Sequence, residues 1–389
     1  MTVEVIRADS ERLRRDFVHF PRRAYRGDPN WVPPLEADEL ALVTGRHPFW
    51  EYGQVVPFLA LSAGRPVGRV AAIRNDLHNR YHGRRDGFFG FFEAVDSVEV
   101  ARALLGAVEA QARQWGFDTV YGPVSPSMND LAGWVVEGTG MPTFLMPYNP
   151  PYYPRLAEAC GYVKAMDLYA YLASRADLEN PRWSRLVQAA ERLAERGRIR
   201  LRRVDMGRLE AEIRAFALEV YPAAWGQNWG FQPITEAELK HMARSLRPVL
   251  VPDLILFAEK IPENPDGGPP EVVGVLIAVP DYNPVLKRLN GRLTPWGLLR
   301  FIWEAKVRRS LKRTRVIAFG VKPAYQQTGV AVLMVHRVVQ NALRLGFEEM
   351  EVSWVLETNR AMRNIVENFG LKPYRKYRIF VRKLGPDGG

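Results

Sequence analysis

The feature of this sequence that most constrains its fold is a pattern of apolar segments that occurs twice along the chain. In each half the spacing of apolar residues predicts a β-hairpin, a strand, an amphipathic helix, a strand, a short helix and a final aromatic strand. The first copy extends from a hairpin at Val56–Ile73 to a strand at Leu168–Leu172. The second extends from a hairpin at Ile255–Val279 to a strand at Tyr377–Val381. This order predicts an α/β fold (an α+β mixed sheet) with two tandem domains, each a mixed sheet flanked by helices.

A polar segment, Ser174–Arg182, separates the two copies and predicts a linker. The chain has 389 residues, which is enough for two or three domains with well-formed cores. We therefore expect a first domain at residues 1–175 and a second domain at residues 183–389. A helix over Trp183–Arg196 is expected to open the second domain.

The composition limits the class of protein. The chain is 47% hydrophobic and 25% charged, which is typical of a globular protein. The single cysteine, Cys160, excludes a disulfide framework within one chain, and no histidine has a partner at metal-ligand spacing, so we expect no metal. No apolar run approaches the roughly 18 residues of a membrane span, and the N-terminus lacks an apolar signal core. These features predict a cytoplasmic protein, and the net charge of +11 allows anionic partners.

One segment indicates a binding function. Val316–Val321 predicts a strand, Pro323 a turn, and Gln326–Ala331 the start of an amphipathic helix. Such a loop presents consecutive backbone N–H groups at the positive end of a helix dipole, which suits a pyrophosphate. Small residues at Gly329 and Ala331 would let phosphates reach those amides. An ordinary strand–loop–helix turn is the alternative interpretation.

The residues Gln326–Ala331 fit the pattern Gln/Arg-x-x-Gly-x-Gly/Ala, which resembles the coenzyme-A-binding loop of the GNAT acyltransferase superfamily. The repeated order of elements is similar to the GNAT fold. Further segments resemble a tandem-GNAT group that includes bacterial ceramide-synthase-like acyltransferases: Gly122–Asp130, Met146–Tyr153, Lys164–Tyr171, Asn228–Phe231, Pro280–Asn283 and Glu357–Asn359.

This resemblance implies an N-acyltransferase. The acyl donor would be acetyl-CoA or a longer acyl-CoA, used as a co-substrate, or an acyl-carrier thioester. The acceptor would be an amine on a small molecule or a lipid-like molecule. A non-catalytic protein that binds acyl-CoA or another ligand with the same fold is the alternative.

The two halves differ at the loop. In the first half the strand Gly87–Glu93 runs almost directly into Asp96 and Ser97, which predict a capped helix. A capping carboxylate at Asp96 would repel a pyrophosphate. We therefore expect a degenerate first domain and a second domain that binds coenzyme A.

The resemblance also implies roles for residues of the second domain. A backbone N–H of Gly320 or Val321 would polarise the reacting carbonyl, because a glycine at a strand end allows a bulge. Asn359 suits a helix cap as well as a contact with the pantetheine arm. The full set of expected donor-binding residues is Val321, Gln326, Gln327, Thr328, Gly329, Val330, Ala331 and Asn359.

Glu357 is the candidate general base, because it follows the strand Glu351–Leu356 next to where the amine would arrive. A capping role or an ion pair with Arg360 or Arg363 is the alternative. The usual acid of the family is a tyrosine in the following helix.

In this chain, alignment on Phe369–Leu371 places Val366 at the position of that tyrosine. Tyr374 and Tyr377 are substitutes by proximity only. Thiolate release needs no acid in principle, since coenzyme A is a good leaving group.

The candidates for contact with the acceptor are polar or aromatic residues in loops: Asn228, Trp229, Asp281, Asn283, Asn129 and Tyr148. Asp281 and Asn283 fall in a segment rich in turn formers, so a turn is the alternative for them. The tryptophan-rich loop is equally consistent with plain core. Asn129 and Tyr148 are equally consistent with capping and turn roles.

A basic run, Arg300–Arg315, contains seven basic residues and one acid, Glu304. A solvated helix face is the commonest explanation of such a run. The alternatives are peripheral contact with a membrane, a dock for an acidic acyl-carrier protein, and contact with the cofactor's 3′-phosphate. Nucleic-acid binding is the weakest interpretation, because the chain contains no recognisable binding module.

Overall fold

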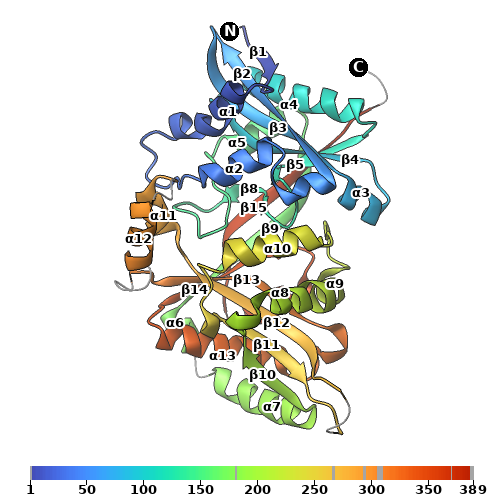
Figure 1. Ribbon diagram of the computed structural model, residues 1–389, viewed down its shortest axis with the longest axis vertical. Helices are drawn as coiled ribbons and strands as arrows, with labels where there is room; N and C mark the ends of the chain where they lie inside the picture. The colour runs from blue at the N-terminus through green and yellow to red at the C-terminus, as the bar shows by residue number, and fades with distance from the viewer. Residues whose placement is uncertain are drawn as a thin grey trace. The chain divides into compact units, whose positions relative to one another are not determined.

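A computed structural model describes residues 2–179, 182–264, 268–291, 295–304, 310–368 and 370–385. The chain divides into two compact units, drawn in Figure 1. Unit 1 comprises Met1–Tyr169, Asn283–Glu304 and Tyr374–Gly389, and unit 2 comprises Ala170–Tyr282 and Ala305–Pro373. Two segments from the second half of the chain therefore belong to unit 1. The functional division between a degenerate and a coenzyme-A-binding domain stays a prediction.

Unit 1 contains a sheet with helices on both faces. Its elements, in chain order, are β1 (Glu4–Arg7), α1 (Glu11–Ala24), α2 (Glu36–Val43), η1 (Pro48–Glu51), β2 (Gly53–Ser62), β3 (Arg65–Asn75), α3 (Asp76–His82), β4 (Asp86–Ala94), α4 (Val98–Gln114), β5 (Thr119–Gly122), β6 (Val124–Ser125), β7 (Leu131–Ala132), β8 (Trp134–Glu137), α5 (Tyr153–Ala159), the first part of β9 (Val163–Ser174), α11 (Asn283–Leu289), α12 (Pro295–Ile302) and nearly all of β15 (Pro373–Lys383).

The sheet of unit 1 has the strand order β1-β2-β3-β4-β5-β15, and β8 also pairs with β15. Strands β1 to β4 are antiparallel neighbours, whereas β4 and β5 are parallel. The predicted hairpin is confirmed as β2 and β3. Helix α4 packs on β2, β3 and β4 and closes the main core of the unit.

Helix α4 forms where the apolar spacing predicts it. Val100, Leu104, Val108 and Ala112 are all buried against the sheet. The Ser97 hydroxyl accepts a hydrogen bond from the Val100 N–H at 3.3 Å and begins the helix. The predicted cap is therefore confirmed at Ser97.

Unit 2 contains its own series of paired strands, also covered by helices. Its elements are the end of β9, α6 (Arg175–Leu178), α7 (Arg182–Arg196), β10 (Ile199–Arg203), η2 (Met206–Arg208), α8 (Leu209–Ala215), η3 (Phe216–Val220), α9 (Tyr221–Trp225), α10 (Glu236–Leu246), η4 (Pro252–Leu254), β11 (Ile255–Lys260), β12 (Glu271–Pro280), β13 (Arg313–Val321), η6 (Pro323–Tyr325), α13 (Val330–Arg344), β14 (Glu349–Leu356) and α14 (Arg360–Asn368). The predicted linker is partly helical, because Ser174 and Asp177 form a capping box at the start of α6.

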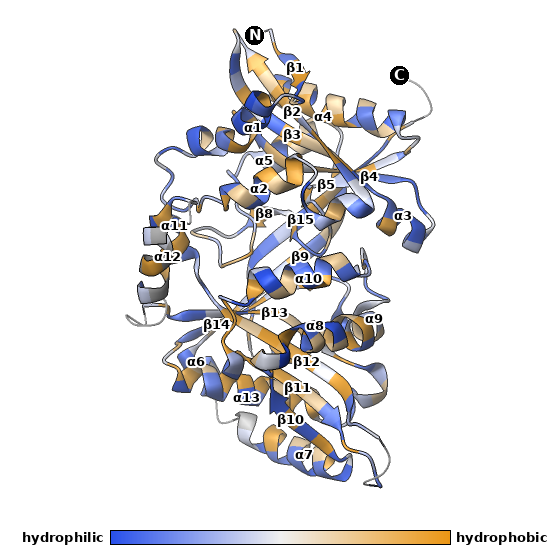
Figure 2. Ribbon diagram, viewed as in Figure 1, coloured by the Kyte–Doolittle hydropathy of each residue, from blue (hydrophilic) through white to orange (hydrophobic). Residues whose placement is uncertain are grey.

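The sheet of unit 2 has the order β14-β13-β12-β11-β10, antiparallel throughout except for the parallel pair β13–β14. Leu276 of β12 faces α13, whereas the adjacent Val275 packs into the cluster formed by α8, η3 and α10. Successive side chains of a strand point to opposite faces, so helices cover both faces. Orange and blue residues share α7 and α13 in Figure 2, as amphipathic helices on a sheet require.

The final strand, β15, lies in unit 1. It pairs antiparallel with β5, from Phe380↔Gly122 to Lys383↔Thr119, and with β8. We expected a strand here, and the strand is confirmed. We expected it to complete the second domain, but an apolar pattern specifies a strand and not its neighbours.

Within the described ranges, no helix has the length and apolar character needed to cross a membrane.

Candidate functional site

The candidate site of unit 2 lies where β13 and β14 separate. The two strands pair in parallel only from Arg313↔Glu349 to Val316↔Val352. Both strands then continue, β13 to Val321 and β14 to Leu356, with no further pairing between them among the described residues. Parallel strands end at the same edge of a sheet, so the loop after β13 and the turn after β14 meet at this edge.

The alternation of hydrogen bonds identifies the backbone groups that face the gap. The Lys322 N–H donates to Val273 O of β12 at 2.8 Å. In an antiparallel ladder, bonded and non-bonded pairs alternate, so Gly320, opposite Val275, also directs its backbone to β12. The backbone N–H and C=O of Val321 therefore point to the other side of β13, where β14 is no longer paired with it. The geometry therefore favours Val321 over Gly320 for the predicted polarising amide.

Gly320 does not form the expected bulge. The register shift in β13 falls at Ile317, because Ile277 pairs with Ala318 whereas Ala278 pairs with Val316. A different physical reason explains why residue 320 is glycine: a Cβ there would lie 2.3 Å from Cη2 of Trp225. The glycine thus lets the tryptophan-rich segment pack against the end of β13.

The loop after β13 leads into α13 without a cap. Gly329 is the N-cap residue, with φ +75°, and no side chain caps the helix. The first N–H groups of a helix have no acceptor within the helix. The Gln326 and Gln327 side chains are exposed beside this end, and Ala331 is half-buried.

Ion pairs hold the start of this loop. Glu271, at the beginning of β12, accepts hydrogen bonds from Lys322 Nζ and from the Tyr325 hydroxyl, both at 2.8 Å. These two hydrogen bonds keep the pKa of Glu271 below its usual value. The Thr328 hydroxyl donates to Tyr325 O at 2.7 Å. Hydrogen bonds within the chain therefore hold this loop conformation.

Gly329 has two reasons to be glycine. Its φ of +75° lies in the left-handed region that favours glycine. A Cβ would also lie 2.7 Å from Cα of Ala190 in α7. From the sequence we predicted only that a small residue at Gly329 lets phosphate reach the amides. We did not predict the contact with α7, because no pattern in the neighbouring residues indicates it.

An apolar cavity of about 50 Å³ adjoins the last β13–β14 pair. The sheet contributes residues such as Val316 and Val352, and helices α13 and α14 contribute Val339 and Val366. Val366, which stands where the resemblance leads us to expect a tyrosine, is buried and keeps this wall apolar. The full lining is Ala173, Asp177, Leu276, Val316, Phe319, Val335, Val338, Val339, Met350, Val352, Met362, Ile365, Val366 and Leu371.

Glu357 and Asn359 lie in the turn after β14, at the same edge as Val321. Asn359 Oδ1 accepts from the Met362 N–H at 3.1 Å, so the predicted helix cap is confirmed. Glu357 is half-buried, and its backbone carbonyl accepts from Arg363 Nη1 at 3.1 Å. The base role of Glu357 stays a prediction, as do the other predicted site roles. Tyr374 and Tyr377 belong to unit 1.

The structure brings only some of the predicted acceptor residues to this edge. The Asn228 N–H donates to Trp225 O at 2.7 Å, so Asn228 and Trp229 follow the residue that covers Gly320. Asp281 lies at the opposite end of β13, where its N–H donates to Arg313 O at 2.8 Å. The sequence could not separate these cases, because the direction of β12 relative to β13 is a long-range property.

The other three acceptor candidates lie in unit 1. Asn283 donates from Nδ2 to Pro142 O at 2.7 Å, and the Asn129 N–H donates to the Ser127 hydroxyl at 3.1 Å. The Tyr148 hydroxyl donates to Asp28 at 2.7 Å. Burial and the Asp28 carboxylate raise the pKa of Tyr148 to about 12.

A buried polar chain on β13 and β14 was missed from the sequence. Arg315 Nε donates to the Ser353 hydroxyl at 2.8 Å, and that hydroxyl donates to Glu351 at 2.5 Å. All three side chains are buried. Arg315 and Glu351 are register partners, a pairing that could have been found only from the strand alignment. This chain links the two strands just before they separate.

The basic run is divided by the fold. Lys312 pairs with Glu348 and Arg313 with Glu349, so these residues are not a free cationic face. Arg300 lies in α12. Lys306, Arg308 and Arg309 lie outside the described residues.

The corresponding junction of unit 1 is filled by the chain itself. Strands β4 and β5 pair in parallel from Asp86↔Thr119 to Phe88↔Tyr121 and then separate. The Ser125 hydroxyl accepts from the Phe91 N–H at 3.0 Å in the gap, and a Cβ at Gly90 would lie 2.2 Å from Val124 O. Asp96 forms an ion pair with Arg155 instead of capping α4.

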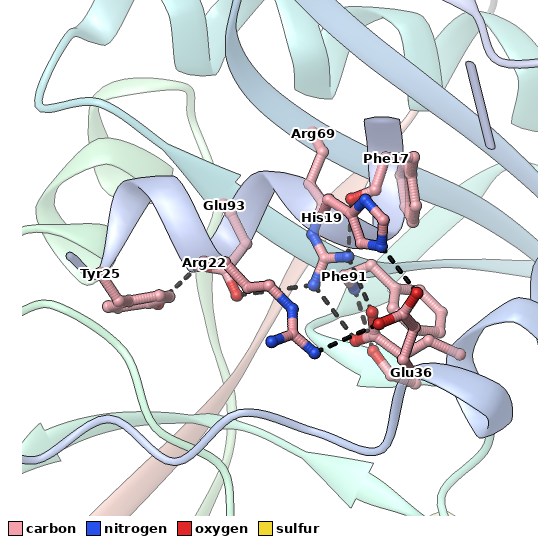
Figure 3. A network of polar contacts seen from close by, with 10 residues as sticks. Phe17, His19, Arg22, Tyr25, Glu36, Arg69, Phe91 and Glu93 are labelled. Atoms are coloured by element: carbon pink, nitrogen blue, oxygen red, sulfur yellow. Dashed lines mark hydrogen bonds and ion pairs between the residues drawn. The ribbon is translucent and has the colours of Figure 1, made fainter. Parts of the chain in front are cut away.

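A buried polar network lies beside this junction and is drawn in Figure 3. Arg69 of β3 is 2% exposed, donates from both Nη atoms to Glu39 at 3.1 and 3.2 Å, and lies over the ring of Phe17. Glu93 accepts from the hydroxyls of Tyr25 at 2.5 Å and Tyr153 at 2.7 Å. Burial outweighs Arg69 and these hydroxyls and raises the pKa of Glu93 to about 7.

No cluster of three or more potential metal ligands occurs in the part of the chain that the structure describes. The arrangement at the edge of β13 and β14 instead combines an uncapped helix terminus, a strand edge without a β14 partner and an apolar cavity. These features fit a ligand with a phosphate group at one end and an apolar or extended chain at the other.

Comparison with known proteins agrees with this geometry. Residues 256–371 match the model of the acetyltransferase (GNAT) family. The chain is 35% identical over 378 residues to the bacterial ceramide synthase of Caulobacter vibrioides, covering 95% of this chain and 94% of that protein. It is 31% identical over 374 residues to protein YghO of Escherichia coli, covering 95% and 92%. A solved tandem GNAT protein from the clavulanic acid biosynthesis pathway shares the fold, with a TM-score of 0.55, 13% identity and full coverage of both chains.

Proposed function

The chain belongs to the GNAT acyltransferase family, in the tandem-domain group that contains the bacterial ceramide synthase, and on this premise we propose that it transfers an acyl group from acyl-CoA to the amine of a lipid-like acceptor. The observation that carries the proposal is the uncapped start of α13, which follows the loop after β13 at the edge where β13 and β14 separate, together with an apolar cavity next to the last pair of these strands. Phosphate, amide-rich arm and an apolar part of the acyl chain would each meet a suitable environment there.

The donor would be held by three kinds of group. The N–H groups at the start of α13, with Gln326 and Gln327 beside them, would bind the pyrophosphate. The edge of β13 at Val321, where Val321 O accepts from Gln326 Nε2 at 3.4 Å, would pair with the pantetheine arm as an added strand would. The apolar cavity next to Val316 and Val366 would receive an apolar part of the donor.

The bound thioester supplies an activated acyl carbon. Residues at the edge would stabilise the negative charge that develops on its oxygen and accept the proton of the amine. The Val321 N–H would donate to the oxygen that becomes negative during attack. Glu357, in the turn after β14, would take the proton of the attacking amine, directly or through a water. Val366 cannot donate a proton, so the thiolate would leave without an acid from α14.

A lipid-like acceptor is supported by the sequence relative. A ceramide is a lipid that contains an amide, and the relative over 95% of this chain is named a bacterial ceramide synthase. The ring of Tyr221 contacts those of Trp225 and Phe231, and Trp225 packs at the end of β13, so the acceptor side of this edge is apolar, as a lipid-like acceptor would require.

Calorimetry with acetyl-CoA, palmitoyl-CoA and free coenzyme A tests the donor site. Gln327→Glu places a negative charge beside the start of α13 and is expected to weaken binding by about 1 kcal/mol, roughly fivefold. The matched control is Gln340→Glu, because Gln340 is exposed farther along the same helix. Gly329→Glu is less suitable, since any side chain there would also collide with α7. Equal affinities for wild type and Gln327→Glu would remove this loop from the donor site.

A non-catalytic ligand-binding protein is the second candidate, and Val366 in place of the family's tyrosine favours it. Both candidates predict donor binding. Incubation with radiolabelled palmitoyl-CoA and a sphingoid amine separates them, because only an enzyme forms a labelled amide. Donor binding without any amide product, over a panel of lipid and small amines, would support the second candidate.

A further inference from the structure

Helix α12 of unit 1 presents an exposed apolar face. Trp296, Leu299 and Trp303 are 82%, 59% and 52% exposed. The helical backbone continues from α12 through Trp303, so the spacing of three and four residues places these side chains on one face. A cluster of large apolar side chains on a surface marks an interaction site more often than chance exposure.

The opposite side of the same helix is packed. Phe301 is buried, and Glu304, which is 2% exposed, forms an ion pair with Arg288 of α11. Residues 297, 301 and 304 have the same helical spacing as the exposed set, displaced around the helix axis. The exposure of the two tryptophans is therefore a consequence of how α12 packs.

The segment that leads into α12 is attached to the body of unit 1. Arg22 Nη1 of α1 donates to Asn290 O at 2.7 Å. The Glu36 N–H of α2 donates to Gly291 O at 3.3 Å. Gly291 has φ +67°, and a Cβ there would lie 2.4 Å from Pro34 O. Unit 1 therefore holds the base of this segment closely.

The sequence around the exposed face is rich in basic residues. The sequence from Lys287 to Arg309 contains seven basic residues and one acid, Glu304, so it supplies six of the chain's eleven net positive charges. The single acid is buried and paired. An anionic surface would therefore meet no exposed acidic residue of this segment.

We propose that the face formed by Trp296, Leu299 and Trp303 docks unit 1 onto the surface of an anionic membrane. The indole ring combines a large apolar body with a polar N–H, and tryptophan is enriched where hydrocarbon meets headgroups. Short helices with an apolar face and basic surroundings lie in the plane of that interface. An acidic protein would match the charge but would not by itself require three large apolar side chains. The proposal does not rest on the proposed function, which concerns unit 2.

Cosedimentation of the full chain with lipid vesicles tests the proposal. One set of vesicles contains equal parts of phosphatidylglycerol and phosphatidylcholine, and the other contains phosphatidylcholine alone. We expect wild type to bind the anionic vesicles at about 0.1 M salt and to bind neutral vesicles less well. Trp296→Ser combined with Trp303→Ser should lower partitioning to anionic vesicles by about tenfold or more.

The matched control is Leu218→Ser, because Leu218 is a 53% exposed apolar residue of η3 in unit 2. It should bind vesicles as wild type does. Unchanged melting temperature and acetyl-CoA affinity in the double variant would show that its loss of vesicle binding is local to α12. Wild-type binding that survives the double substitution would overturn the proposal and leave charge alone as the cause. Absence of vesicle binding would also overturn it, and a dimer in sedimentation velocity that the double variant loses would identify a second copy as the occupant.

Discussion

Two strand-to-helix junctions, β4–α4 in unit 1 and β13–α13 in unit 2, share a plan and differ in what occupies it. Each strand carries one extra residue in its register, and each leaves its parallel neighbour after three or four pairs. In unit 1 the Ser97 side chain caps the helix and the Ser125 hydroxyl accepts the Phe91 N–H. In unit 2 no side chain caps α13, and an apolar cavity adjoins the gap.

The difference shows how one fold gives a junction filled by its own chain in unit 1 and a junction whose helix has no side-chain cap in unit 2. Polar backbone groups at helix starts and strand gaps need partners. Unit 1 provides these partners from its own chain, through two serines. In unit 2 no side chain caps α13, and we propose that a ligand supplies the partner there. Two serine hydroxyls therefore supply hydrogen-bond partners at the junction of unit 1 without a change of fold.

The largest expected effect is on catalysis. Glu357→Gln removes the candidate base of unit 2 and should lower kcat by about 10²- to 10⁴-fold. The matched change in unit 1, Glu93→Gln, should leave kcat within about twofold, because Glu93 belongs to unit 1 whereas the proposed donor loop belongs to unit 2. Steady-state kinetics of both variants with the same acyl-CoA measures this. A normal kcat for Glu357→Gln would exclude it as the base.

The second effect is on stability and compares two glycines. Gly90→Ala and Gly320→Ala should each lower the free energy of unfolding by about 1–3 kcal/mol through overpacking. The added methyl at Gly320 meets the Trp225 side chain, whereas at Gly90 it meets Val124 O. Denaturant unfolding should therefore show a smaller cost for Gly320→Ala in a Trp225→Ala background. No such relief from Trp225→Ala would mean that Trp225 does not limit the space at Gly320.

The third effect is a pH dependence specific to unit 1. The pKa of Glu93 is raised to about 7 in the folded chain, above its value of about 4.3 when unfolded. The folded state thus binds the proton more tightly, and the resulting stability is present below about pH 4 and decreases as the pH rises towards and through 7. We expect Glu93→Gln to remove this dependence while keeping an oxygen that accepts from Tyr25 and Tyr153. Thermal unfolding between pH 5 and 8 measures it, and parallel pH curves for the variant and wild type would contradict the assignment.

The smallest effect concerns the caps. Ser97→Ala should cost about 1 kcal/mol of stability, because one N–H of α4 loses its acceptor. It should not change acetyl-CoA affinity, since the donor site is proposed in unit 2. Chemical denaturation and calorimetry measure the two quantities. A Ser97→Ala chain that bound a second equivalent of acetyl-CoA would show that a single hydroxyl keeps unit 1 closed.

Local patterns predicted much of the candidate site. The strand at β13, the polar loop and the start of α13 follow from residues within about 15 positions of one another, a range in which periodicity and turn residues act. The cap at Asn359 was predicted for the same reason and is confirmed. The expected bulge at Gly320 was wrong, because a register shift depends on the partner strand and lies at Ile317.

The sequence by itself determined the repeated order of elements, the amphipathic helices and the unequal loops of the two halves, because each depends on neighbouring residues. Only the tertiary structure decided that β15 pairs with β5 and β8 in unit 1, that Trp225 packs on Gly320, and that Ser125 occupies the gap beside β4. These contacts join residues far apart in the chain. Their positions depend on which strands become neighbours. The sequence does not specify those neighbours, because the apolar period of two residues in a strand is the same whichever strand pairs with it.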